Sequence, residues 1–387
     1  MATTHAPVSV VRPELFRKFN HVPAYEIVPV SRSWLERIGD WLHRRVVRRF
    51  VRWNSESMAF LVSQLPIMFG AVAAMVRLGG FEALLKRPQS LEELAETLQV
   101  DAHSLVHILR PLLAMHFIDR DVHDIYSIGP LGREYTSQGR QPFAAWVELV
   151  DRIQVPVMSQ LPDAIRAGEP LTRFVYHKTC WEVMAEHPGT CELHDVACGR
   201  WTELCVDEVA KCCDFSNVKT LIDIGGGRGA FLAAMLRAAP HVSGAVYDRQ
   251  ETHAAAGEMF CGKGVADRAE HLVGNFFEEV PAGRDLYTIK HVLHDWDDES
   301  VRKILSNIRR AMSAHSKLLI VEGSVDHNVA PGEIVRSLFD LHQYAATWGC
   351  SRTFDEFARL CADSGLHLQR VIPTRLIDPQ IMECVPA

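Results

Sequence analysis

Apolar positions in the C-terminal half of the chain alternate between two periods. Short apolar runs predict four β-strands, at Val218–Ile224, Val242–Tyr247, Asp285–Ile289 and Lys317–Val321. Apolar residues at helical spacing predict helices between these strands, at Ala230–Ala238 and Ser300–Met312. Strands that alternate with helices are typical of a doubly wound α/β sheet.

The part of the chain before this alternation has mostly helical periodicity. The pattern predicts an apolar helix, a helix that a capping box opens, an amphipathic helix and a hairpin of two short strands. These lie, in chain order, at Phe60–Val76, Ser90–Thr97, Asp101–Met115 and Phe117–Ile128. Helices followed by a hairpin are typical of a winged-helix arrangement.

A third pattern precedes both. Arg32–Trp53 interleaves seven arginines with apolar residues at roughly helical spacing. Such a basic amphipathic segment packs on its own protein or on a second subunit, or makes a peripheral contact with an anionic membrane surface. We therefore divide the chain into an N-terminal extension (residues 1–55), a helical domain (56–179) and an α/β domain (180–387).

Composition limits the function classes. A chain of 387 residues is long enough for two domains, and its net charge of −7 argues against a dedicated nucleic-acid binder. Met1–Val10 lacks the charged start and apolar run of a secretion signal. Polar residues and Pro66 interrupt Phe60–Val76, which leaves it short for a membrane span of roughly 20 apolar residues. We therefore expect a cytoplasmic protein.

The ten cysteines contain no CxxC pair. Cys191, Cys198, Cys205 and Cys212 are each seven apart, which places them on one face of a helix. This row is either a stripe of thiols or metal ligands, or a seam of small apolar residues packed in a core, and we favour the seam. Ligands seven apart on a straight helix lie about 10 Å from each other, so we expect no metal.

The strongest motif is Leu221–Gly229, with the sequence Leu-Ile-Asp-Ile-Gly-Gly-Gly-Arg-Gly between a strand and a helix. Glycines allow a tight turn and close approach of a ligand to the backbone. Gly225 and Gly227 also satisfy a looser dinucleotide fingerprint. Asp223 at the strand end would repel a pyrophosphate but can hold an ammonium group. S-adenosylmethionine has an ammonium and no phosphate, so the motif favours this cofactor.

A second acid, Asp248, ends the next predicted strand, about 20 residues after the glycines. An acid at this spacing binds the hydroxyls of a ribose in nucleotide-binding folds. The alternative role of Asp248 is that of a helix N-cap, and the glycines upstream favour ribose binding.

Two further stretches, Gly274-Asn-Phe-Phe277 and Asp285–Asp298 with its His-Asp-Trp, complete a recognisable pattern. Together with the glycine motif it resembles the class I O-methyltransferases of the caffeic acid, hydroxyindole and bacterial natural-product type, from about Met58 to the C-terminus. The resemblance implies a Rossmann-like domain that binds S-adenosylmethionine and a winged-helix domain that serves dimerization. It also implies a homodimer that methylates a hydroxyl of a small aromatic or lipophilic secondary metabolite.

The resemblance also implies roles for single residues. Gly225 would contact the methionine part of the cofactor, and Lys290 would lie at the cofactor's edge. Asn275 and Phe276 would lie near the adenine. His294 matches the catalytic base, and Glu322 matches the acid that orients it. This agrees with the chemistry, because a hydroxyl must lose its proton to attack a methyl group and histidine, with a pKa near about 6.5, can accept it.

Two positions depart from the family's pattern. Asn275 stands where an aspartate is usual, although an amide oxygen can still accept a hydrogen bond from the adenine. Ser351 stands where many members have a second glutamate beside the histidine.

The resemblance places the acceptor pocket on the helix before the glycine motif and on the stretch after Glu322. The residues that these segments offer are Trp181, Met184, His194, Asp195, Cys198, Phe339, Asp340, His342, Gln343 and Trp348. His194, Asp195 and Cys198 are three donors for a metal, but no fourth ligand is evident, so we expect polar lining or plain packing instead.

Three other functions remain open beside O-methylation. The acceptor atom can be nitrogen or carbon, because fold and cofactor site do not dictate it. Members of the family that bind the cofactor also catalyse hydroxylation or pericyclization without methyl transfer. A DNA-binding regulator without enzymatic activity is suggested by the winged-helix pattern alone, and the acidic net charge and His294 count against it. The acceptor's identity is not determined by the sequence.

Overall fold

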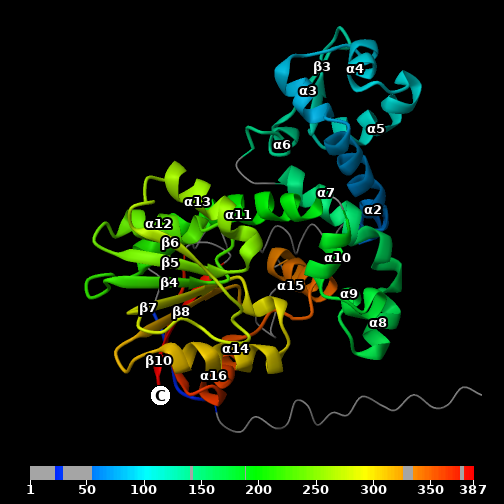
Figure 1. Cartoon of the computed structure of the whole chain (residues 1–387). Helices are drawn as coiled ribbons and strands as arrows, with labels where there is room; N and C mark the ends of the chain where they lie inside the picture. Colours follow the sequence, from blue (N-terminus) through cyan, green and yellow to red (C-terminus); the bar gives the residue numbers. More distant parts are fainter. Residues whose placement is uncertain (1–21, 29–54, 140–142, 188, 326–333, 375–378) are drawn as a thin grey trace, which may run out of the picture.

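The computed structural model describes residues 22–28, 55–139, 143–187, 189–325, 334–374 and 379–387 (Figure 1). The basic amphipathic segment at 32–53 lies outside the described residues. A short piece of the N-terminal extension is described, and it joins the sheet. β1 (Glu26–Ile27) pairs in parallel with β9 (Leu366–Ile372), and Tyr25 Oη donates a hydrogen bond of 2.6 Å to Asp355 Oδ1.

An eight-stranded sheet forms the centre of the C-terminal domain, in the order β1-β9-β10-β8-β7-β4-β5-β6. Between β1 and β9, the chain contributes five further strands to this sheet: β4 (Thr220–Ile224), β5 (Ser243–Asp248), β6 (Ala269–Val273), β7 (Leu286–Lys290) and β8 (Lys317–Glu322). Neighbours pair in parallel except at β10 (Gln380–Pro386), which runs antiparallel to β8 and β9. The predicted α/β sheet is confirmed, and β1, β6, β9 and β10 were not predicted.

Helices cover both faces of this sheet (Figure 1). One apolar core lies between the sheet and α11 (Thr190–Cys212), α12 (Ala230–Ala238) and α13 (His253–Gly262). The other lies beneath α14 (Asp298–Ala311) and α16 (Phe354–Asp363). The helix predicted at Ala230–Ala238 has those bounds, because the glycine turn sets its start.

The connections from β4 and β7 determine where a ligand can bind. β4 lies between β5 and β7, and the chain winds in opposite directions on its two sides. At such a switch point the loops after neighbouring strands separate and leave a crevice at the carboxyl ends. The glycine motif follows β4, and His294 follows β7, so both lie at this edge.

The N-terminal region has the helix and hairpin order that the winged-helix prediction requires. Its elements are α2 (Ser55–Arg77), α3 (Gly80–Lys86), α4 (Leu91–Leu98), α5 (Ala102–Ala114), β2 (Ile118–Arg120) and β3 (Tyr126–Ile128). The predicted capping box at the start of α4 is confirmed, because Glu93 N donates to Ser90 Oγ and Ser90 N donates to Glu93 Oε2. Gln89 bridges to Tyr126 beside the hairpin.

Further helices connect this region to the sheet domain. They are α6 (Pro130–Arg133), α7 (Phe143–Ile153), the 3₁₀ helix η2 (Val155–Gln160), α8 (Leu161–Ala167), α9 (Leu171–Tyr176) and α10 (Cys180–Glu186). The segment 155–178 packs on α15 (Ile334–Ala346), where Thr172 Oγ1 donates to Ala345 O at 2.6 Å and Tyr344 Oη donates to Glu169 O at 2.7 Å. Part of the predicted helical domain therefore shares a core with the C-terminal region.

The expectation that the apolar stretch after residue 55 is too short for a membrane span needs a correction. α2 has 23 residues and, by length and composition alone, could cross a membrane. Its C-terminal third is buried in the N-terminal core through Val72, Ala73 and Met75.

Candidate functional site

The glycine turn after β4 has a backbone that other residues rarely adopt. Gly225, Gly227 and Gly229 have φ values of 68°, 54° and 78°. A Cβ on Gly226 would lie 2.3 Å from Asp223 Oδ2, so the turn can pass over this carboxylate only because the side chain is absent. Gly229 precedes α12 and exposes the first amides of that helix to the crevice.

Asp223 is buried beneath this turn. Its Oδ1 accepts a hydrogen bond of 2.8 Å from Thr288 Oγ1, while Oδ2 has no hydrogen-bond partner within the described part of the chain. Burial raises the pKa of this carboxyl to about 7, although Thr288 and Lys290 act in the opposite direction. A buried acceptor without a donor, next to a turn without side chains, fits a ligand that brings a cationic donor.

Asp248 closes the turn from the end of β5. Its Oδ2 accepts a hydrogen bond of 2.6 Å from Gly227 N, and its Oδ1 accepts one of 2.7 Å from Arg249 N. The next α-helix, α13, starts at His253, with Thr252 as its N-cap residue. The N-cap alternative for Asp248 is therefore wrong, and its carboxylate faces the glycine turn.

The other residues predicted around the cofactor lie at the same edge of the sheet. A Cβ on Gly225 would lie 3.6 Å from the Phe276 ring, so this ring borders the turn. Lys290 Nζ donates to Thr202 Oγ1 on α11 at 3.0 Å. Asn275 is exposed, and its side-chain amide accepts from Phe277 N and donates to Glu278 Oε1.

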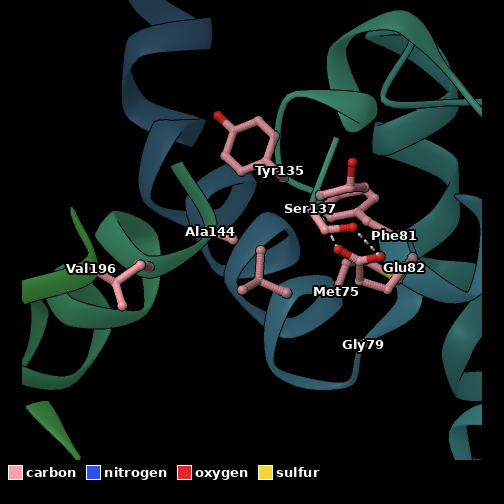
Figure 2. A pocket seen from close by; sticks show the side chains of 11 residues that line it. Met75, Gly79, Phe81, Glu82, Tyr135, Ser137, Ala144 and Val196 are labelled. Atoms are coloured by element: carbon pink, nitrogen blue, oxygen red, sulfur yellow. Dashed lines mark hydrogen bonds between the residues drawn. The ribbon is translucent and has the colours of Figure 1, made fainter. Parts of the chain in front are cut away.

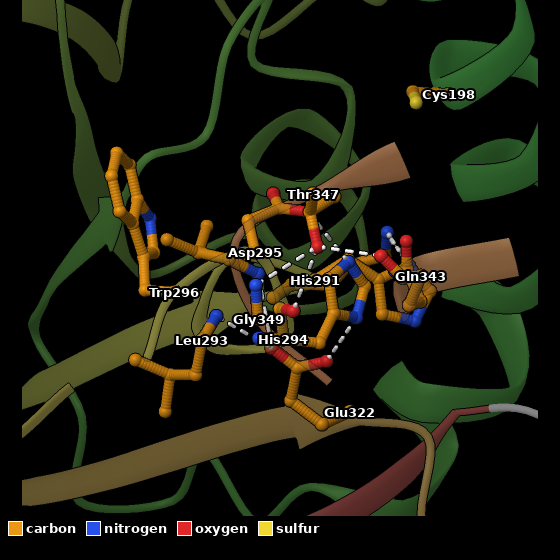
Figure 3. A network of polar contacts seen from close by, with 12 residues as sticks. Cys198, His291, Leu293, His294, Asp295, Trp296, Glu322, Gln343, Thr347 and Gly349 are labelled. Atoms are coloured by element: carbon orange, nitrogen blue, oxygen red, sulfur yellow. Dashed lines mark hydrogen bonds and ion pairs between the residues drawn. The ribbon is translucent and has the colours of Figure 1, made fainter. Parts of the chain in front are cut away.

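His294 lies in the 3₁₀ turn η4 (Leu293–Asp295) directly after β7, and it is 8% exposed. Its Nδ1 is 2.8 Å from Glu322 Oε2, at the end of β8 (Figure 3). The other oxygen of Glu322 accepts hydrogen bonds from the backbone N–H groups of residues 292–294, at 3.0, 2.8 and 3.4 Å. A proton on Nδ1 leaves the lone pair of the ring on Nε2, which is the arrangement of a general base.

A second residue holds this turn, and the sequence reasoning missed its role. Arg352 is 2% exposed and donates to Leu293 O at 2.9 Å, to Trp296 O at 2.7 Å and to Asp298 Oδ1 at 2.9 Å. Gly349 lies so close that a Cβ would come within 2.1 Å of His294 O. Arg352 follows Ser351 in a stretch that the family pattern had already singled out.

The structure also shows the contacts of Ser351 and a second acid near the histidine. Ser351 forms a hydrogen bond with Asp340. Burial raises the pKa of Asp340, although the bond from Ser351 lowers it. The second acid near the histidine is Asp295, whose Oδ1 lies 3.6 Å from His294 Nε2. Burial raises the pKa of Asp295 to about 6, while the charge of His294 acts in the opposite direction.

Aromatic rings extend from His294 along one wall. Phe339 lies 6.0 Å from His294 and 6.2 Å from His342, and His342 lies 4.8 Å from Trp146, between ring centroids. Burial lowers the pKa of His342 to about 4, with His294 and His194 acting in the same direction, so its ring is neutral at pH 7. Trp146, on α7, was not predicted. Gln343 is buried on the same helix as Phe339.

The residues predicted on α10 and α11 separate into two groups. Met184 is buried in a small core with Leu149, Ile153 and Val183, whereas Trp181 packs edge-on against His194 at 4.9 Å. Among the described residues, no group of three or more histidine, cysteine or acidic side chains is placed to hold a metal ion. Trp348 Nε1 donates to Lys178 O at 2.8 Å.

The row of cysteines lies on one helix, as predicted, since α11 contains all four. The prediction that they form a seam packed in a core is wrong for two of the four. Cys205 is buried and Cys212 is partly buried, but Cys191 and Cys198 are exposed. α11 joins the core against the sheet through Val206 and Val209, in its C-terminal half, which the spacing of the cysteines alone did not indicate.

A pocket of about 360 Å³ lies away from this site, where the N-terminal region meets α7 and α11 (Figure 2). Met75, Phe81 and Tyr135 line it, and Val196 borders it from α11. Its one acid, Glu82, accepts a hydrogen bond from Ser137 Oγ. None of the predicted cofactor or acceptor residues borders this pocket.

Comparison with known proteins adds to this geometry. The O-methyltransferase domain family matches residues 158–367. A mitomycin biosynthesis 6-O-methyltransferase of Streptomyces lavendulae is 34% identical over 309 residues, which cover 78% of this chain and 86% of that protein. An 8-amino-8-demethylriboflavin N,N-dimethyltransferase of Streptomyces davaonensis is 25% identical over 302 residues, or 76% and 84%.

Solved structures agree with the sequence relatives. The structure of a mitomycin 7-O-methyltransferase superposes with a TM-score of 0.81 at 32% identity and covers 88% of this chain and 100% of that one. An O-methyltransferase from neocarzinostatin biosynthesis, in complex with S-adenosylmethionine and 2-hydroxy-5-methyl naphthoic acid, has a TM-score of 0.71 at 27% identity. It covers 82% of this chain and 96% of that one.

The three bonds of Arg352 predict a large effect of its removal. Arg352→Met removes the donor to Trp296 O and one of two donors to Leu293 O, whose remaining bond from Trp296 N is 3.3 Å long. It also removes the partner of Asp298, so we expect a loss of about 3 kcal/mol in unfolding free energy, measured by urea denaturation. Arg302→Met is the matched control, because its ion pair with Asp363 is exposed and should contribute less than about 1 kcal/mol. Equal losses in the two variants would contradict the role of Arg352.

Proposed function

The chain belongs to the O-methyltransferase domain family and is an S-adenosylmethionine-dependent methyltransferase, and from this premise we propose a specific reaction and specific residues for it. The reaction is the transfer of the cofactor's methyl group to a hydroxyl of a small aromatic or lipophilic metabolite, with His294 as general base. The observation that carries the proposal is the pair formed by His294 Nδ1 and Glu322 Oε2.

The cofactor is held by the edge of the sheet around β4. Asp223 accepts the ammonium group and Asp248 the ribose hydroxyls, while Gly225 and Gly227 keep the backbone close to the methionine part. Phe276 and Asn275 border the adenine, and Lys290 closes the side toward α11. Two observations support this assignment: Asp223 Oδ2 has no donor within the described residues, and no heavy atom beyond the chain neighbours lies within 4 Å of where a Cβ on Gly227 would be. Bound there, the cofactor supplies a methyl group on a positively charged sulfur.

His294 removes the proton of the acceptor hydroxyl. Glu322 holds the proton on Nδ1 and stabilises the imidazolium that forms, so that Nε2 receives the acceptor's proton. Asp295, near Nε2, adds a second negative charge that favours the imidazolium. Arg352 and Glu322 fix the turn from two sides, which keeps Nε2 in place during the transfer.

The wall beside His294 supports an aromatic acceptor. Phe339, His342 and Trp146 present ring faces and edges, and His342 is neutral. Planar acceptors gain both apolar contact and ring–ring interactions on such a wall. One relative is named as an O-methyltransferase of mitomycin biosynthesis, and the neocarzinostatin O-methyltransferase was solved in complex with 2-hydroxy-5-methyl naphthoic acid, which has a ring system. Trp181, His194, Cys198, Asp340 and Gln343 complete the proposed pocket.

A second candidate reaction is methylation of an amine. One relative of this chain is named as an N,N-dimethyltransferase acting on an aminoriboflavin. An aromatic amine needs no proton removed before it attacks, so that reaction would not depend on His294 as a base. The buried pair of His294 and Glu322 favours the hydroxyl acceptor.

The partner of the chain in solution is a second copy of itself. The first half of α2 carries an exposed apolar face, and Phe60, Val62 and Ile67 are 70%, 57% and 69% exposed. α15 adds exposed Ile334 and Leu338. A soluble protein rarely leaves such a stripe in water, so the second copy covers it. This supports a cytoplasmic enzyme whose residues 56–179 serve dimerization, beside an extension at 1–55 and a cofactor-binding domain at 180–387.

We predict that His294→Ala lowers kcat by about 10²–10⁴-fold, because the acceptor then keeps its proton. Affinity for S-adenosylhomocysteine should stay unchanged, since His294 is not among the residues proposed to hold the cofactor. Glu322→Gln should also lower kcat, because its amide N–H against Nδ1 favours the tautomer with the proton on Nε2. A His294→Ala enzyme with most of its activity would point to amine methylation or to a reaction without proton removal.

The raised pKa of Asp223 predicts a pH dependence of cofactor binding. Below pH 7 the unliganded carboxyl is mostly neutral, and it becomes an ammonium-binding carboxylate as the pH rises through about 7. We expect the affinity for S-adenosylhomocysteine, measured by calorimetry, to increase about ten-fold from pH 5.5 to 7.5.

Two variants separate this effect from others. Asp223→Asn should bind weakly and lose the trend with pH, because the amide does not titrate in this range. Asp248→Ala should bind weakly at both pH values but keep the trend. An affinity of the wild type that falls with rising pH would refute the contact between Asp223 and the ammonium group.

The dimer is tested by light scattering. The wild type should show twice the mass of the chain at micromolar concentration, and Phe60→Glu with Ile67→Glu should show the mass of one chain, since charges at a buried interface are costly. Val122→Glu is the control, because Val122 is 93% exposed on the hairpin turn, away from α2. A monomeric wild type would exclude the proposed interface.

A further inference from the structure

His194 and Cys198 form a pair that the proposed methyl transfer does not use chemically. They lie one turn apart on α11, and Cys198 Sγ is 3.3 Å from His194 Nε2. A thiol and an imidazole at this distance share a proton, and the partner of lower pKa loses it. Four residues along a helix is the spacing that brings two side chains together on one face.

The surroundings favour the charged form of both partners. Burial lowers the pKa of His194, but Cys198 and Asp195 outweigh it and raise this pKa well above its ordinary value. Burial and, to a smaller extent, Asp295 raise the pKa of the Cys198 thiol. His194 and the Lys290 ammonium outweigh both, so the pKa lies below its ordinary value. Both shifts favour the same state, an imidazolium beside a thiolate.

The sulfur is also within reach of a small molecule. Cys198 is exposed, and three charged groups, His194 on α11, Lys290 on β7 and Asp295 on η4, act on its thiol. Trp181 packs edge-on against the His194 ring and limits its movement. Figure 3 shows Cys198 on the helix facing the His294 turn. An accessible thiolate beside cations is the arrangement of reactive cysteines.

We propose that Cys198 and His194 form a second reactive centre, which adds α,β-unsaturated carbonyl compounds, including quinones, to the Cys198 sulfur. The thiolate attacks the β-carbon, and a carbon–sulfur bond forms while the π electron pair moves through the enolate. His194 Nε2 delivers its proton to the α-carbon and becomes neutral. The product is a thioether, and the addition needs no oxidant, reductant or leaving group.

Because the pair lies among the proposed acceptor residues, the addition would inhibit the enzyme; this inference rests on the proposed function. A dihydroxylated aromatic acceptor has a quinone as its oxidised form, which is an electrophile of this class. Cys198 lies among the proposed acceptor residues, so a thioether there would fill the acceptor pocket and stop turnover. The pair would thus bind the oxidised acceptor covalently, while the reduced acceptor is methylated.

The probe for the pair is N-ethylmaleimide, an α,β-unsaturated dicarbonyl compound. The purified full-length protein is treated at pH 6.0 and 8.0, and the rate at each cysteine is followed by peptide mass spectrometry. Cys191 is the internal control, because it is exposed on the same helix, seven residues earlier. At pH 6.0 we expect Cys198 to react at least about ten-fold faster than Cys191, because an ordinary thiol is mostly protonated there.

His194→Gln tests the role of the imidazolium. The ratio of the Cys198 rate to the Cys191 rate should fall at least about five-fold at pH 6.0, and less at pH 8.0, where ordinary thiols also ionise. Because both rates come from one sample, a partly unfolded variant is recognised when all buried cysteines, such as Cys361, also react. Equal rates at Cys198 and Cys191 at pH 6.0 in the wild type would overturn the proposal, as would an unchanged ratio in His194→Gln.

The labelling needs neither cofactor nor acceptor, so its outcome is independent of the methyltransferase assay. Rapid labelling of an enzyme that methylates no hydroxyl would support the reactive pair and contradict only the proposed O-methylation. Slow labelling of Cys198 in an enzyme that methylates a phenol would support the proposed O-methylation and overturn the reactive pair.

Discussion

The buried carboxylate of Glu322 is the group on which the geometry of the active site depends. It is 0% exposed at the end of a central strand, where an uncompensated charge would cost several kcal/mol. Three backbone N–H groups and the His294 ring compensate it. The chain after β7 must therefore turn sharply over Glu322, and this turn fixes the position of His294.

The same turn organises the acceptor wall. Its outward carbonyls need donors, and Arg352 reaches two of them from the segment that follows α15. Gly349 permits the close approach that this requires. Because the chain is anchored there, α15 ends beside His294 and holds Phe339 near it. The position of the proposed acceptor residues thus depends on Glu322 through contacts between segments that are far apart in the sequence.

The two buried carboxyls of the site differ in a way that matches their proposed roles. Glu322 has its donors within the protein, so its charge is already compensated. Asp223 keeps an oxygen without a donor, and its raised pKa is the result of burial in the absence of a cation. An interior group left unsatisfied lowers stability, and such groups occur where a ligand completes them.

The sequence by itself determined the elements whose causes are local. The cap of α4, the glycine turn and the bounds of α12 follow from residues within a few positions of each other, and β7 with its His-Asp-Trp followed from an apolar run and a motif. Only the tertiary structure decided β10, which includes Pro386 and Glu383 and is a strand because β8 and β9 flank it. It also decided the clamp by Arg352 and the exposure of Cys198. Periodicity and turn chemistry act along the chain, whereas burial and long-range hydrogen bonds depend on which segments pack together.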